Sequence, residues 1–416
     1  MDSSNRGSDA FNLDAALWAR HKRIEIVSAC QSRDVAALSS LAQSRHGLLS
    51  DSLRQAACAL HQSHPSFTPC RASTDLGLPR YQLGPILLGL PLPPPLGADA
   101  PPPADDWKNL PCHRDEDQVQ LDVNRSFVYY PAHQSEAELE RCKLDLSSLI
   151  IEVLRRNPYL CYFQGYHDIC QVFLLVLGPV RRAEAVSRLS VLRIRDFMLP
   201  SLAPTTAQLR LLPDILTKAD PELRRHIASV EPFYALAGTL TMYAHNIERY
   251  RDIVRLFDVL LAREPVFTIY LFACIVMDRR DEVLDIDEPD MLQVTLAKVP
   301  ADMDIDGLVV KAVALYDRFP PQSLPSWHQI SSASVLKTAR DVCDCATQTL
   351  QQGRAYFQRQ VSELWWLNTR QSILLVLGRY RRPVRAIGMA FAVAAVAFYL
   401  RQNPATMRYL TGLFSK

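Results

Sequence analysis

The sequence predicts an all-α protein built from many helices. Long stretches carry apolar residues at three- and four-residue spacing, which is the period of a helix with one buried face. A β-hairpin is indicated by an Asn-Gly or Asp-Gly turn between two alternating apolar and polar runs, and the sequence contains no such arrangement. Helix packing on helix is therefore the expected architecture of this chain of 416 residues.

The clearest predicted helix covers residues 135–156. Ser135 is followed three residues later by Glu138, the reciprocal pattern that satisfies two free amides at a helix start. Asn157-Pro158 ends the helix, because the residue before a proline avoids helical backbone angles. Residues 159–178 are almost entirely apolar or aromatic and predict a central helix. Further helices are expected over residues 184–197, 206–217, 220–228, 231–245, 249–262, 265–278, 289–298 and 305–317.

Composition excludes several classes of protein. The formal net charge of +2 gives no reason to expect nucleic acid as a partner, since a backbone binder carries a strong basic excess. The first thirty residues lack the apolar core of a secretory signal, so the ten cysteines are expected to be reduced thiols of a cytosolic body. No Cys-x-x-Cys pair occurs, and no metal site is expected.

Shifts in composition divide the chain into five segments. Residues 1–62 predict short N-terminal helices, and residues 63–106 predict an extended proline-rich insertion holding 11 of the 28 prolines. Residues 107–320 predict the main helical body. Residues 321–378 predict a polar helical connector, and residues 379–416 a C-terminal membrane anchor.

The anchor prediction depends on fifteen uncharged residues, Ala386 to Leu400. As a helix at 1.5 Å per residue the run would be about 22 Å long, against a hydrocarbon core of about 30 Å. It is apolar on all faces and follows a polar connector, and its flanking arginines can snorkel to the headgroups. Such a short span suits the thinner bilayer of the endoplasmic reticulum. An interfacial helix and a buried core helix remain as alternatives.

Residue spacing alone identifies no active site. No phosphate-cradling loop of the Gly-x4-Gly-Lys type occurs, and neither Gly-x-Ser-x-Gly nor His-Glu-x-x-His is present. His167 next to Asp168 on an apolar segment is more typical of a core histidine than of a catalytic base. Composition and periodicity therefore predict a helical cytosolic domain with a C-terminal anchor, and they do not predict its activity.

Two short motifs resemble the signatures of a known family. Residues 119–125, Val-Gln-Leu-Asp-Val-Asn-Arg, resemble Ile-x-x-Asp-x-x-Arg, and residues 162–166, Tyr-Phe-Gln-Gly-Tyr, resemble Tyr-x-Gln-Gly followed by a bulky residue. These are the marks of the TBC domain, the Rab GTPase-activating fold. The resemblance extends over about residues 46–280. It includes an opening segment, 47–54, and a later segment, 255–258, in which Phe257 stands where most members carry tryptophan.

The resemblance implies a GTPase activator that works in trans. Arg125 would be an arginine finger and Gln164 a glutamine finger, inserted into a GTP-bound Rab-family GTPase. Asp122 would hold the guanidinium of Arg125. The supporting residues would be Asp122, Tyr162, Gly165 and Tyr166. The chain would carry no cofactor of its own, because the partner GTPase brings the GTP and Mg²⁺.

The resemblance also implies a location. Residues 164–169, together with a C-terminal apolar tail, most resemble the small branch of the family anchored in the endoplasmic-reticulum membrane. That branch acts on Rabs of early secretory traffic, with the catalytic domain in the cytosol.

Other interpretations of the same residues remain open. Asp122 and Arg125 could form an ordinary surface ion pair, Gln164 a hydrogen bond near a helix start, and Tyr162 and Tyr166 packing contacts. At the level of the protein, the alternatives are a non-catalytic, membrane-anchored Rab-binding adaptor and an unrelated anchored helical protein.

Overall fold

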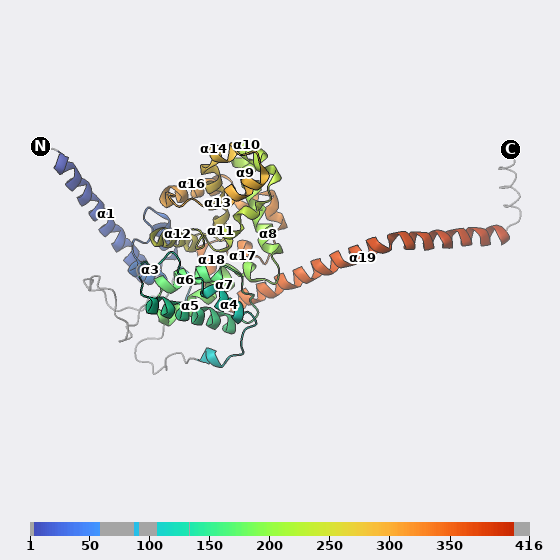
Figure 1. The fold of residues 1–416 in the computed structure, drawn as a ribbon, viewed down its shortest axis with the longest axis horizontal. Helices are drawn as coiled ribbons and strands as arrows, with labels where there is room; N and C mark the ends of the chain where they lie inside the picture. Colours follow the sequence, from blue (N-terminus) through green and yellow to red (C-terminus); the bar gives the residue numbers. More distant parts are fainter. Residues whose placement is uncertain (1–3, 59–86, 91–105, 133, 403–416) are drawn as a thin grey trace. The chain divides into compact units, whose positions relative to one another are not determined.

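The computed structural model describes residues 4–58, 87–90, 106–132 and 134–402 (Figure 1). It contains two compact units, Met1–Gln360 and Val361–Lys416. Every regular element in these described ranges is a helix, so the all-α prediction is confirmed there.

Three helices open the first unit: α1 (Ser4–Ser32), α2 (Val35–Gln43) and α3 (Asp51–Cys58). Asp34 begins α2, because its side chain accepts a hydrogen bond from the Ala37 amide at 2.9 Å. Helix α2 packs on both α1 and α12 (Tyr250–Ala262), and α3 packs on α1 and α6 (Tyr166–Val176). The N-terminal helices are therefore part of the same core as the later motifs.

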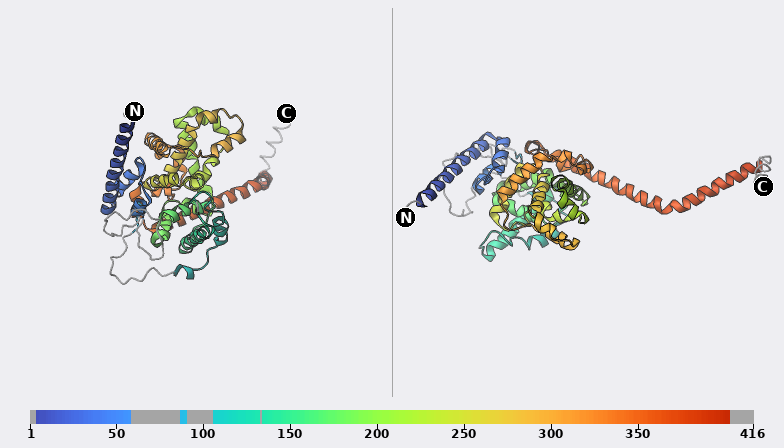
Figure 2. Two further views of the ribbon diagram at one scale, coloured as in Figure 1. Left: turned by 60° about the vertical axis from the view of Figure 1, so that its left-hand side comes forward. Right: turned by 90° about the horizontal axis from the view of Figure 1, so that it is seen from above.

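Helices α4 (Glu116–Val123), α5 (Glu136–Arg156), α6 and α7 (Pro179–Leu192) form the layer that carries both motifs. Helix α5 contacts the other three, and Figures 1 and 2 show these green helices side by side. The predicted capping box is confirmed, since Glu138 accepts from the Ser135 amide at 2.8 Å while the Glu138 amide donates to the Ser135 hydroxyl.

The remaining helices complete the body around the apolar helix α13, which packs on α16 and α9. Their bounds are α8 Ala203–Leu209, α9 Leu211–Ala219, α10 Pro221–His226, α11 Leu236–Leu240, α13 Phe267–Asp278, α14 Arg280–Leu284, α15 Pro289–Ala297, α16 Ile305–Arg318, α17 Val335–Thr338, α18 Val342–Thr347 and α19 Leu350–Gln402. Short 3-10 helices lie at Asp106–Asn109, Arg195–Met198, Ile227–Ser229, Pro232–Ala235, Pro321–Ser323 and Pro325–Gln329.

Several predicted helices differ from the sequence pattern. The helix expected over 184–197 ends at Leu192, the one expected over 206–217 is divided into α8 and α9, and the one expected over 220–228 is α-helical only up to His226. The helix expected over 159–178 begins only at Tyr166, because Gly165 adopts left-handed angles (φ 99°, ψ −9°) and breaks the helical path before it. The helix expected over 231–245 ends at Leu240. Met242 and Tyr243 follow with positive φ and are buried, so the chain turns there although both residues are apolar.

Part of the proline-rich insertion is packed against the body. Leu87, Leu88 and Leu90 are buried, and the guanidinium of Arg188 on α7 donates to the Leu88 carbonyl. Gly89 has φ +67°, and a Cβ added there would lie 2.0 Å from the Ala346 carbonyl oxygen. The extended loop expected over 63–106 is therefore wrong for these four residues. Residues 63–86 and 91–105 lie outside the described residues.

The predicted connector, residues 321–378, is divided at residue 360. Up to Gln360 it belongs to the first unit, where Asp196 is almost fully buried. The Asp196 carboxylate accepts from Ser334, from the Val335 amide at 3.1 Å and from the Gln360 side chain at 2.9 Å. These buried contacts are long-range in sequence, so the polar composition of the segment does not reveal them.

The second unit contains the rest of α19. Its described apolar side chains between Met389 and Phe398 are exposed to solvent within the unit. None of the described helices combines the length and apolar character needed to cross a membrane. Residues 403–416 of the predicted anchor lie outside the described residues.

Candidate functional site

Arg125 lies just beyond the end of α4. Its backbone amide donates to the Asp122 carbonyl at 3.0 Å, which continues the chain in a turn after Val123. The Arg125 side chain is 65% exposed, whereas the Asp122 side chain is fully buried. An Nη2 atom of Arg125 donates to the Asp122 Oδ1 atom at 2.6 Å. A buried carboxylate therefore orients a guanidinium that faces solvent.

The Asp122 carboxylate also joins the two motifs. Its Oδ2 atom accepts a hydrogen bond from the Tyr162 hydroxyl at 2.9 Å, and its Oδ1 atom accepts from the Gln118 amide at 3.1 Å. The Nδ1 atom of His167 lies 3.8 Å from Oδ2. Asp122 is thus fixed from three directions, and the Arg125 motif is tied to the segment that carries Gln164.

Gln164 is exposed in the turn between buried Phe163 and buried Gly165. Gly165 caps α6, and its carbonyl accepts from the Asp168 amide at 3.1 Å. A Cβ at Gly165 would lie 2.6 Å from the Thr241 Cγ2 atom, closer than any real contact. Only glycine therefore satisfies both the left-handed angles and this close approach.

Replacing Gly165 with alanine is expected to destabilise the fold. A Cβ in the left-handed region costs about 1–2 kcal/mol, and the clash with Thr241 adds to it. The free energy of unfolding, measured by urea titration, should fall by about 2 kcal/mol or more.

Two matched variants check this prediction. Adding Thr241→Ser to Gly165→Ala removes the methyl group in conflict and should recover part of the loss. Gly178→Ala, where nothing lies within 4 Å of the new Cβ and φ is −65°, should have little effect. An equal loss for Gly165→Ala and Gly178→Ala would contradict the argument.

Two aromatic residues, Tyr162 and Tyr166, flank the Gln164 turn and pack against each other. Tyr166 is fully buried, and its hydroxyl lies 2.7 Å from the Ser190 Oγ atom. The Tyr162 ring packs edge-on against Tyr166 with centroids 6.0 Å apart. Burial raises the pKa of both phenols, so both hydroxyls stay protonated and can donate. These two residues therefore brace the site, as the packing interpretation expects.

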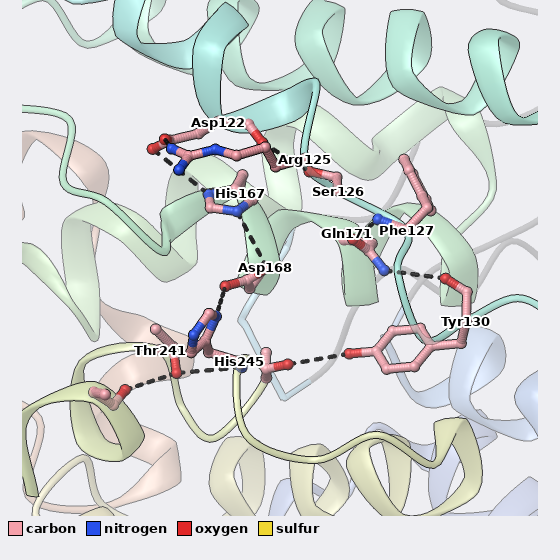
Figure 3. Close-up of polar contacts among 12 residues, drawn as sticks. Asp122, Arg125, Ser126, Phe127, Tyr130, His167, Asp168, Gln171, Thr241 and His245 are labelled. Carbon is pink, nitrogen blue, oxygen red and sulfur yellow. Dashed lines mark hydrogen bonds and ion pairs between the residues drawn. The ribbon is translucent and has the colours of Figure 1, made fainter. Parts of the chain in front are cut away.

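A chain of polar contacts continues from Asp122 to the surface. The Nε2 atom of His167 lies 3.3 Å from Asp168 Oδ1, and the Nδ1 atom of His245 lies 3.0 Å from Asp168 Oδ2 (Figure 3). Burial lowers the pKa of His167, so it is neutral at pH 7. The hydrogen bond to Asp168 raises the pKa of His245. No sequence signal singled out His245, which lies 77 residues from its partner.

His245 is expected to make stability depend on pH. Because its folded pKa is raised above the ordinary 6.5, its contribution is present below pH 6.5 and is lost as pH rises through the folded pKa. Urea unfolding of wild type and His245→Gln should therefore differ more at pH 6 than at pH 8.5. A difference that is constant with pH would contradict the ion pair.

The turn after Arg125 is fixed by Gln171, a buried residue of α6. Its Oε1 atom accepts from the Phe127 amide at 3.1 Å, and its Nε2 atom donates to the Tyr130 carbonyl at 3.2 Å. The Tyr130 hydroxyl donates to the Ala244 carbonyl at 3.3 Å (Figure 3). Gln171 was visible in the sequence only as a polar exception in the apolar stretch 159–178.

The opening and later segments also meet in space. Arg54 donates to both carboxylate oxygens of Asp258 at 2.9 Å, and the Leu48 amide donates to Asp258 Oδ2 at 3.0 Å. Phe257 is buried against Phe173 with ring centroids 6.0 Å apart, so it occupies an aromatic core position. This cluster is structural, since its carboxylate is 3% exposed.

Together these contacts define a helical domain with an exposed arginine that a buried carboxylate orients. The same carboxylate binds Tyr162, two residues before the exposed Gln164. Residues 101–284 match the family described as the Rab-GTPase-TBC domain. TBC1 domain family member 20 of Bos taurus is 35% identical over 312 residues, which cover 73% of this chain and 69% of that protein. The human protein of the same name is 35% identical over 295 residues, covering 70% and 65%.

A fungal relative supports the same assignment. GTPase-activating protein gyp10 of Schizosaccharomyces pombe is 31% identical over 259 residues, which cover 61% of this chain and 68% of that protein. The chain belongs to the Rab-GTPase-TBC domain family. Within the residues that the structure describes, no group of three or more His, Cys, Asp or Glu side chains could hold a metal ion.

Proposed function

We propose that this chain stimulates GTP hydrolysis by a GTP-bound Rab-family GTPase, using Arg125 and Gln164 in trans. The observation that carries the proposal is the exposed Arg125 guanidinium held by fully buried Asp122, which also binds Tyr162 of the Gln164 motif. An exposed ion pair contributes little to the free energy of folding. The firmly held Asp122 carboxylate is therefore better explained by the need to orient the Arg125 guanidinium.

The chemistry suits these residue types. During hydrolysis negative charge develops on the transferring phosphoryl group, and a planar guanidinium can donate to its oxygens. Gln164 has an exposed amide whose carbonyl and NH₂ can orient the attacking water. The partner supplies GTP and Mg²⁺, so the chain needs no cofactor of its own for this reaction.

The test is single-turnover GTP hydrolysis by a panel of purified Rab GTPases with the full-length chain added. Stimulation of one or a few Rabs that is lost in both Arg125→Ala and Gln164→Ala would support the proposal and identify the substrate. Rab binding without any stimulation by wild type would instead indicate the non-catalytic adaptor. Failure to bind any Rab would overturn the proposal.

We also propose that residues 379–416 anchor the chain in the endoplasmic-reticulum membrane, where it regulates early secretory traffic. The support is the uncharged run Ala386–Leu400 with arginines on both sides. Described residues of that run, including Phe391 at 73% exposed and Phe398 at 63%, present apolar side chains to solvent. Anchoring would raise the effective concentration of the domain against Rabs on the same membrane.

Deleting residues 379–416 tests the anchor. The truncated chain should move from the membrane fraction to the soluble fraction, because it loses the apolar run. Stimulation of GTP hydrolysis in solution should remain within about twofold of wild type, since no side chain of the site lies in this segment. Retention on membranes, measured by flotation, or a loss of solution activity would contradict the proposal.

A further inference from the structure

Two large apolar side chains are exposed in the turn that follows Arg125. Val128 is 75% exposed and Tyr129 is 51% exposed, whereas their neighbours Phe127 and Tyr130 are 8% and 4% exposed. Single apolar residues on a surface are ordinary. Here, however, two adjacent ones project from a turn whose flanking aromatic residues are buried.

This turn is held in one conformation. Gln171 accepts from the Phe127 amide at 3.1 Å and donates to the Tyr130 carbonyl at 3.2 Å, so it closes the turn across its base (Figure 3). Phe127 is fixed with φ 64°, and the Tyr130 hydroxyl is bonded to the Ala244 carbonyl. Val128 and Tyr129 are thus presented in advance of any binding event, which lowers the ordering cost of an interface.

Position relative to Arg125 decides what covers these side chains. Val128 is three residues after Arg125. Even a fully extended chain would separate the Cα atoms of these two residues by at most about 10 Å. A standard interface buries about 800 Å² on each partner, equivalent to a disc of roughly 16 Å radius. An interface of that size on a GTPase whose nucleotide is reached by Arg125 is wide enough to include Val128 and Tyr129 as well.

We propose that Val128 and Tyr129 form the apolar contact that seats the GTP-bound Rab beside Arg125, and that they set affinity rather than rate. This inference rests on the proposed function and names the surface through which that site takes its partner. Tyrosine in such a place is typical of residues that dominate binding energy, because it brings a large rigid area at low entropic cost. Neither side chain carries a group that acts on the phosphate.

The experiment uses the full-length chain with Val128→Ser, Tyr129→Ser and both together. Binding to each Rab of the panel loaded with a non-hydrolysable GTP analogue is measured alongside single-turnover hydrolysis. The double variant should weaken binding and raise the half-saturating concentration by about tenfold or more. The rate at saturation should stay within twofold of wild type, since uniform binding is removed without touching the transition state.

Val310→Ser is the matched control, because Val310 is 69% exposed on α16, which Figure 1 shows at the opposite end of the first unit from α4. It should leave both binding and hydrolysis unchanged. Binding by the double variant within twofold of wild type would overturn the inference, as would a lower saturating rate with unchanged binding. Failure of the proposed function gives a different result. In that case wild type binds a Rab without accelerating GTP hydrolysis, and the double variant still loses the binding.

Discussion

Arg125→Ala is expected to lower the stimulated rate of GTP hydrolysis by about 10³- to 10⁵-fold, the usual contribution of an arginine supplied in trans. That loss corresponds to about 4–7 kcal/mol of transition-state stabilisation. The reason lies in the geometry of the site. A fully buried Asp122 carboxylate holds the Arg125 guanidinium from one side at 2.6 Å, and the rest of the side chain is exposed and free to enter a partner.

Single-turnover kinetics at saturating concentration of the chain measure this effect. Arg125→Lys should recover little of the rate, because an ammonium is a point charge and not a planar fork. The free energy of unfolding should change by only about 1 kcal/mol, since Asp122 keeps its hydrogen bonds from Gln118 and Tyr162. A stimulated rate that survives in Arg125→Ala, or that is lost only because the protein unfolds, would contradict the mechanism.

Local sequence patterns predicted the features that depend on local interactions. The capping box of Ser135 and Glu138 is present, and the helix that it begins ends at Arg156, directly before Asn157-Pro158. Helices α12 and α13 begin and end within two residues of their predicted bounds. In each case neighbouring residues determine the backbone, so periodicity and capping chemistry are sufficient evidence.

Contacts between distant segments could not be predicted in the same way. Gly165 interrupts the predicted helix with left-handed angles, and Thr241, 76 residues later, occupies the space that a Cβ would need there. Asp168 meets His245 only because the turn after α11 brings them together. Leu88 is buried and its carbonyl oxygen accepts from Arg188, 100 residues later, although the surrounding prolines indicate an extended loop. Motif resemblance located Arg125 and Gln164, but it did not reveal the contacts around them.

Arg54→Ala is expected to lower the free energy of unfolding by about 3–5 kcal/mol, the cost of leaving a buried charge without its partner. Asp258 is 3% exposed, and Arg54 donates to both of its oxygens at 2.9 Å. Without Arg54, the Leu48 amide is the one hydrogen-bond donor left to that carboxylate among the described residues. Urea unfolding of the full-length chain measures the loss.

Two further variants separate the buried charge from other causes. The double variant Arg54→Met with Asp258→Asn should recover most of the stability, because both charges are removed and the asparagine oxygen can still accept from the Leu48 amide. Lys311→Ala breaks an exposed ion pair with Asp278 and should cost less than about 1 kcal/mol. A double variant as unstable as Arg54→Ala would show that packing, and not the unpaired charge, accounts for the loss.

The Arg54 and Arg125 variants should therefore fail in opposite ways. Helix α12, which carries Asp258, packs on α6, whose first turn follows Gln164. Arg54 itself donates to Asp51 and Asp258, neither of which belongs to the motifs of Arg125 and Gln164. At a temperature where Arg54→Ala is still folded, its stimulated rate per folded molecule should stay within about twofold of wild type. Arg125→Ala should instead stay folded and lose the rate, so the pair of measurements separates support of the fold from chemistry at the site.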